Sequence, residues 1–120
     1  MVDIHAHEGD GFKAVMNFES WRVAIMNHAP HQCREAVTQL SRHLETDEAF
    51  ALLSGQATIC WADGDIPQAL HYTQLTPGQL YNVRRGTWHT VLTQPGTKLV
   101  VVENSDTSAA NSEKYPVSLV

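Results

Sequence analysis

Short apolar runs separated by turn signals make up most of the chain after residue 45. The segments Ser54-Gly55, Thr76-Pro77-Gly78 and Gln94-Pro95-Gly96 each place glycine where a turn needs a positive φ, and in the last two a proline precedes it. The spacing of the runs between these turns predicts an all-β fold, an antiparallel sandwich or barrel. The expected strands are Glu48–Leu53, Gln56–Trp61, Leu70–Leu75, Leu80–Val83, Trp88–Thr93 and Leu99–Glu103.

The first third of the chain gives a weaker pattern. Residues 21–26 read as a strand, with Trp21, Val23 and Ile25 on one face and Arg22 on the other. Residues 32–44 fit both a helical stripe and one face of a strand. Residues 1–13 are expected to form a polar arm and residues 105–120 a surface tail, around a core of about residues 14–104. The length of 120 residues predicts a single domain.

Composition and charge exclude several functional classes. A net charge of -5 argues against a broad basic surface for nucleic acid. No apolar run approaches the roughly 18–20 residues of a membrane span, and the first residues lack the pattern of a signal peptide. Cys33 and Cys60 lack metal-knuckle or redox spacing and are expected to be inert. We therefore expect a cytoplasmic protein with reduced cysteines.

Seven histidines are the main candidates for chemistry, and two of them lie in patterned segments. In the first segment, four residues separate His43 from Glu48, and six separate Glu48 from Gly55. In the second, Gly78 is followed by Gly86 and then by His89. His5 and His7 at the chain start are better explained by exposure, although this arm could add a ligand.

These two segments resemble the two motifs of the cupin superfamily. His43 matches the second histidine of the first motif, Glu48 its glutamate and His89 the histidine of the second motif. The chain departs from the pattern at Ser41 (first histidine), Arg84 (proline) and Thr93 (asparagine). The resemblance covers roughly residues 36–104. It implies a cupin-type double-stranded β-helix, a jelly-roll barrel with most strand edges hidden, and it favours a strand over residues 36–43.

The same resemblance implies that His43, Glu48 and His89 are three of the four usual metal ligands. An unbroken strand would point His43 and Glu48 to opposite faces, so a turn or a bulge at residues 45–47 is required for them to converge. Two imidazoles and one carboxylate suit a divalent ion, Zn, Fe, Mn or Ni. The alternative without metal is a pair of interior histidines that hydrogen-bond to Glu48.

Three functional hypotheses follow. The first is a metal-dependent enzyme acting on a small anionic organic molecule, with Tyr81, Tyr72 or Arg84 as candidate catalytic or orienting groups. The second is a small-ligand-binding or sensor cupin without metal, whose apolar interior encloses the ligand. The third is a structural or interaction domain. The expected interior of the second hypothesis is Phe50, Leu52, Ile59, Val91 and Val101.

Several expected strands are apolar on both faces. In residues 49–53, Ala49, Ala51 and Leu53 lie opposite Phe50 and Leu52, and residues 99–102 repeat this pattern. Two-sided apolar strands in a small sandwich suggest that part of the outer surface is covered. A homodimer is the simplest cover and is compatible with all three hypotheses.

Overall fold

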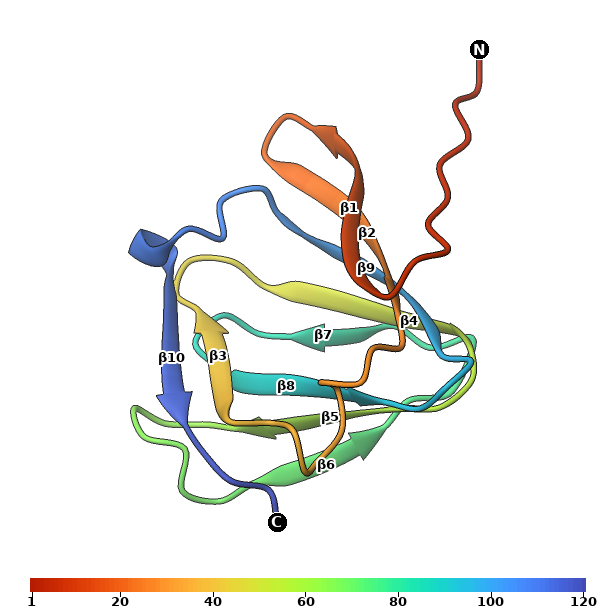
Figure 1. Cartoon of the computed structure of the whole chain (residues 1–120). Coiled ribbons are helices and arrows are strands. Elements are labelled where there is room, and N and C mark those ends of the chain that lie inside the picture. Colours follow the sequence, from red (N-terminus) through yellow and green to blue (C-terminus); the bar gives the residue numbers. More distant parts are fainter.

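Ten strands and one short 3₁₀ helix make up the structure, a computed structural model that describes all of residues 1–120 (Figure 1). The helix η1 (Ala109–Asn111) is the only helical segment, and it is far too short to cross a membrane. The strands are β1 (Gly11–Phe18), β2 (Trp21–Asn27), β3 (Gln39–His43), β4 (Glu48–Ser54), β5 (Ala57–Ala62), β6 (His71–Gln74), β7 (Tyr81–Val83), β8 (Trp88–Thr93), β9 (Lys98–Asn104) and β10 (Ser112–Pro116).

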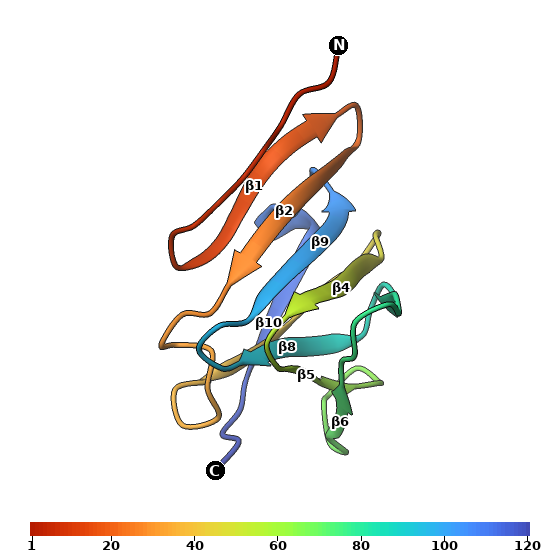
Figure 2. The same cartoon turned by 90° about the vertical axis from the view of Figure 1, so that its right-hand side faces the viewer.

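The strands form two five-stranded antiparallel sheets. The first sheet has the order β1-β2-β9-β4-β7 and the second the order β10-β3-β8-β5-β6. Figure 2 shows β1, β2, β9 and β4 side by side. The all-β jelly-roll prediction is confirmed. The expectation that a barrel would hide most strand edges was wrong, because the two sheets share no strand pair and each keeps two edge strands.

The predicted turn at Ser54-Gly55 is where the chain leaves one sheet for the other. Gly55 has a φ of 76°, in the left-handed region that favours glycine. A Cβ at this position would lie 2.5 Å from the Cα of Thr97. Gly55 is therefore required both by its backbone conformation and by the close approach of the loop before β9.

Both ends of the chain contribute a strand to a sheet, where the sequence predicted a polar arm and a surface tail. Strand β1 begins at Gly11, inside the expected polar arm. Strand β10 lies inside the expected tail and pairs with β3. Tyr115, Val117 and Leu119 pack on or join a buried cluster on the outer face of the second sheet, around Leu40 and Trp88. The polar residues between 104 and 114 misled the prediction, because an edge strand needs apolar residues on one face only.

The ambiguous segment 32–44 also resolves. Residues 39–43 form β3, and residues 32–38 precede it in turns and loop, so the strand is shorter than the resemblance implied. Cys60 is buried in the outer cluster and Cys33 is partly exposed, and both are free thiols.

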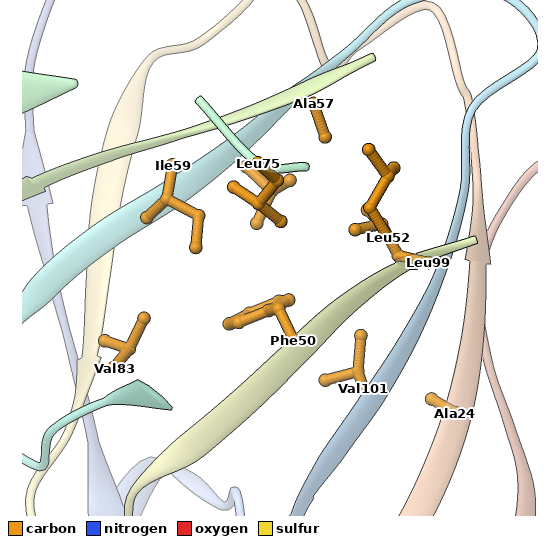
Figure 3. Close-up of a cluster of buried hydrophobic side chains, with 10 residues drawn as sticks. Ala24, Phe50, Leu52, Ala57, Ile59, Leu75, Val83, Leu99 and Val101 are labelled. Carbon is orange, nitrogen blue, oxygen red and sulfur yellow. The ribbon is translucent and has the colours of Figure 1, made fainter. Parts of the chain in front are cut away.

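The main core lies between the two sheets (Figure 3). It contains all five residues that the sequence predicted for an enclosed apolar interior, and Phe50 is its largest fully buried side chain. The full cluster is Ala24, Phe50, Leu52, Ala57, Ile59, Leu75, Val83, Val91, Leu99 and Val101.

The other face of the first sheet is also apolar but remains partly open. Strand pairing aligns Val23 and Ala49 with Val102, and Ile25 and Ala51 with Val100. We call these residues, with the exposed Leu53 beside them, the outer apolar face.

Candidate metal site

The three predicted ligands converge on one point between the sheets. His43 Nε2, Glu48 Oε1 and His89 Nε2 lie within 4.8 Å of one another. Glu48 Oε1 is 2.8 Å from His89 Nε2 and 3.8 Å from His43 Nε2. All three side chains are at most 14% exposed. His43 lies at the end of β3, Glu48 at the start of β4 and His89 in β8.

The expected turn between His43 and Glu48 is a crossing from one sheet to the other. Strand β3 ends at His43 in the second sheet, and β4 begins at Glu48 in the first. Residues 44–47 span the gap, so the two side chains face each other across the sandwich instead of pointing apart.

The crossing loop is tied to the turn before β8. Asp47 accepts hydrogen bonds from the Arg85 backbone N–H (2.8 Å) and from the Asn82 side chain (3.0 Å). The Gly86 N–H donates to the His43 carbonyl oxygen at 2.7 Å. These bonds connect the segments that carry the two motifs, and they bring His89 to the other two residues.

Hydrogen bonds at the far ring nitrogens fix the orientation of both histidines. His89 Nδ1–H donates to the Thr87 carbonyl oxygen at 3.0 Å. The Ser112 hydroxyl donates to the Thr107 carbonyl oxygen, so it accepts from His43 Nδ1–H at 3.0 Å. Each histidine therefore turns Nε2 toward the site, an arrangement typical of metal-binding imidazoles.

Burial and the neighbouring carboxylate act differently on the two rings. Burial lowers the pKa of His43, which keeps this ring neutral and its Nε2 lone pair available. Burial also opposes the charged form of His89, but the hydrogen bond to Glu48 outweighs it and raises the pKa of His89. Burial opposes ionisation of Glu48, yet hydrogen bonds with His89 and Glu103 bring the net pKa of Glu48 down.

Two further charged residues border the site, and the sequence analysis did not select either. Glu103 of β9 places Oε2 3.7 Å from His43 Nε2, and its side chain is 3% exposed. Arg22 of β2 donates from Nε and Nη2 to Glu103 Oε1, at 2.9 and 2.6 Å. Burial, followed by the contact with Glu48, raises the pKa of Glu103 to about 7. The sequence signal that could have identified them is a charged residue within an otherwise apolar strand, Arg22 in β2 and Glu103 in β9.

The proposed catalytic candidates lie away from this point. The Tyr81 hydroxyl donates to Gln79 Oε1 and accepts from the Thr76 backbone N–H. Tyr72 is 41% exposed, and the Arg34 guanidinium lies 4.3 Å from its ring centre. Arg84 lines a separate cavity of about 420 Å³ that Tyr81 also lines.

The N-terminal histidines supply no ligand to the three-residue group. His7 Nε2 is hydrogen-bonded to the Gly11 carbonyl oxygen at 3.2 Å. His5 is exposed. Neither belongs to the group of converging ligand atoms.

A cavity of about 310 Å³ opens on the three residues. It is smaller than the cavity near Arg84, but it is the one that His43, Glu48 and His89 line. Phe12, Met26 and Phe50 give it apolar walls, while the polar side chains on its wall are His31, Gln32, Ser41 and Thr90.

The donor set fits a divalent cation. Ligand atoms each about 2.1 Å from one ion lie at most about 4.2 Å apart, and both distances from Glu48 Oε1 fall within this limit. The hydrogen bond between His89 and Glu48 is also what the metal-free alternative predicted, but His43 makes no such bond. A cation can take the place of the proton that His89 and Glu48 share.

Comparison with known proteins gives structural matches only. No family model matches the chain, and no curated protein matches it. A cupin-2 domain containing protein from Shewanella frigidimarina is similar, with 16% identity, a TM-score of 0.57 and coverage of 82% of this chain and 84% of the other. FeII HppE has 13% identity and a TM-score of 0.60, over 77% of this chain and 48% of HppE. Oxalate decarboxylase from Bacillus subtilis has 16% identity and a TM-score of 0.56, over 79% of this chain and 24% of the enzyme.

These matches agree with the motif resemblance at the level of the fold. The chain spans most of the cupin-2 protein, but less than half of HppE and about a quarter of oxalate decarboxylase. The two five-stranded antiparallel sheets and the convergence of His43, Glu48 and His89 from both motifs agree with this fold. The chain has the cupin fold.

Proposed function

We propose that this protein binds a divalent cation through His43, Glu48 and His89, and that the bound cation holds a small anionic organic molecule. The observation that supports this most directly is the convergence of two Nε2 atoms and one carboxylate oxygen. Both rings are held by Nδ1–H bonds that turn Nε2 toward the other ligand atoms.

Charge is the argument for an anionic ligand. With both histidines neutral, a divalent cation would be offset by Glu48 and Glu103, and Arg22 would add one positive charge. The filled site would then carry a net positive charge in a buried setting, where a small anion is the favoured occupant. The cavity of about 310 Å³ has room for a small organic molecule.

The residues around the cation would position the ligand and exclude water from it. When bound, the cation would polarise a carbonyl or carboxylate oxygen of the ligand, which is the chemistry of a metal-dependent enzyme. Phe12, Met26 and Phe50 would exclude water from one side of the ligand. Gln32 accepts hydrogen bonds at Oε1 from Thr93 Oγ1 and the Ala29 N–H, so its amide nitrogen is free to donate to an anion.

Metal analysis tests the proposal. Protein purified without chelator is analysed for Zn, Fe, Mn and Ni, and chelated protein is then titrated with each ion by calorimetry. One ion per chain is expected, with binding abolished in His89→Ala and retained in His71→Ala, because His71 is exposed and outside the ligand group. Absence of metal in the purified protein, together with no heat of binding for any ion, would reject the proposal.

A second function is supported by the direct 2.8 Å bond between His89 and Glu48, which needs no metal, and by Ser41 at the first-histidine position. Under this alternative the protein binds a small organic ligand in the same cavity without a cation. His43→Ala and His89→Ala would then leave ligand affinity largely intact in a chelated buffer. A collapse of affinity in both variants would argue against this alternative.

A further inference from the structure

Glu103 lies beside two of the three proposed ligands, His43 and Glu48. In the pairing of β4 with β9, Glu48 is opposite Glu103, so both side chains project from the same face of the first sheet. Like charges in opposite positions are unfavourable, and here both carboxyl groups are largely shielded from water. Such a pair is stabilised when a cation lies between the two carboxylates.

Arg22 determines which oxygen of Glu103 faces the site. Arg22 pairs with Glu103 across β2 and β9 and donates two N–H bonds to Oε1. Arg22 is itself held by a 3.1 Å bond from Nη2 to Thr107 Oγ1. Arg22 does not bond Oε2, which lies 3.7 Å from His43 Nε2, within the range that two ligands of one ion can span.

The second sheet lacks one metal ligand because Ser41 stands where the motif has its first histidine. Ser41 pairs with His89 across β3 and β8 and lines the same cavity. A serine side chain ends one atom beyond Cβ and lacks the imidazole ring of the motif's histidine, and a hydroxyl is a weaker ligand for a divalent ion. The second sheet thus supplies two histidines, and the first sheet supplies two carboxylates.

We propose that Glu103, through Oε2, is a fourth ligand of the divalent cation and takes the place of the histidine that Ser41 lacks, with Arg22 as a positioning residue. The inference rests on the proposed function, since it requires that a cation binds. It goes beyond that function because Glu103 lies outside both motifs.

The test is a titration of chelated protein with Co²⁺, followed by calorimetry and by the visible absorption of the bound ion. Glu103→Gln keeps the size of the side chain and an acceptor for Arg22, but removes the anionic ligand. The control is Glu113→Gln, which removes another carboxylate that is paired with an arginine but is 47% exposed and outside the group of converging ligand atoms.

We expect Glu103→Gln to weaken Co²⁺ binding by about 100-fold or more and to change the absorption bands, whereas Glu113→Gln leaves both unchanged. Adding Ser41→His to Glu103→Gln should recover affinity by about tenfold or more, which a merely structural role of Glu103 would not explain. Binding of Co²⁺ to Glu103→Gln within threefold of wild type, with the same spectrum, would overturn the inference and leave the three-ligand site intact.

A crystal structure of the wild-type protein loaded with Mn²⁺ avoids any effect of substitution on folding. Oε2 of Glu103 within about 2.3 Å of the ion supports the inference. A distance beyond about 3 Å overturns it, even when His43, Glu48 and His89 bind the ion. Failure of the wild-type protein to bind any ion would refute the proposed function itself.

Discussion

Removing Arg22 would leave the Glu103 carboxyl group buried without its partner. Arg22 donates two hydrogen bonds to Glu103, whose side chain is 3% exposed and faces Glu48 across the strand pair. Breaking a buried ion pair from one side costs about 3–5 kcal/mol. Arg22 is 22% exposed, so water can reach the gap, and we expect Arg22→Met to cost about 3 kcal/mol at pH 8.

Urea unfolding of the metal-free protein measures this loss. With a slope of about 1.5 kcal/mol per molar urea, a change of about 3 kcal/mol shifts the midpoint by about 2 M. The Arg22→Met/Glu103→Gln double variant should recover roughly half of the loss, because no charge is then left unpaired. Glu113→Gln is the control: it removes the 47% exposed partner of Arg42, and the loss should be at most about 1 kcal/mol.

The loss should also depend on pH with a defined sign. The pKa of Glu103 is raised to about 7 from 4.5, so its protonated form is the one the fold favours. A raised pKa contributes stability below the unfolded value that is lost as pH rises through the folded value. The deficit of Arg22→Met should therefore be larger at pH 8 than at pH 5. A midpoint shift below about 0.5 M at pH 8, or one independent of pH, would refute this reasoning.

Four further results are expected. Phe50→Ala removes the largest fully buried side chain and should cost about 3–5 kcal/mol in urea unfolding; a loss below 1.5 kcal/mol would contradict the assigned core. Gly55→Ala should destabilise the protein clearly more than Gly78→Ala, since both have positive φ but only a Cβ at Gly55 meets the backbone of Thr97; equal melting temperatures would speak against that contact. Hydrogen bonds from the Asn82 side chain and then the Arg85 N–H lower the pKa of Asp47, so its contribution to stability should be present above pH 4 and fall away in stronger acid; Asp47→Asn should flatten that acid limb in a thermal-melt series. The outer apolar face predicts a homodimer, and a strictly monomeric sedimentation profile at high concentration would count against it.

The sequence could predict the metal-ligand candidates because each lies in a spaced motif. His43 and Glu48 required only a turn between them, and the polar residues 45–47 supplied it. His89 lies on a strand whose alternation also buries Val91 and Thr93, and the structure buries all three. The resemblance to the two cupin motifs selected these three residues, and two-residue periodicity then placed His89 on the inward face of its strand.

The other half depends on strand register, which local patterns do not reveal. Arg22 and Glu103 are separated by 81 positions in the chain and meet only because β2 pairs with β9 in one register. A shift of β2 by one residue would turn Arg22 to the outer apolar face and away from Glu103. No motif spacing connects them, so the sequence analysis placed Arg22 on a face without finding its partner.

Strand β10 shows a different limit. Tyr115, Val117 and Leu119 occupy alternate positions, which is a strand signal. The serines and asparagines before them suggested a tail, and the partner strand β3 was itself ambiguous. An edge strand that pairs on one side only carries too weak a pattern to be separated from a loop without its partner.

The arrangement of charge in the first sheet explains where a site can form in so small a sandwich. Pairing across β2, β9 and β4 places Arg22, Glu103 and Glu48 in one row, and the neighbouring inward-facing row is Ala24, Val101 and Phe50, all fully or almost fully buried. A charged row in the middle of the core would pay the full desolvation cost, whereas this one lies at the end of the sheets beside the crossing loop, where Arg22 still reaches solvent. A cation bound there would join carboxylates of one sheet to histidines of the other. Its binding free energy would then add directly to the stability of the fold, by about 2.7 kcal/mol at a free-ion concentration 100 times the dissociation constant.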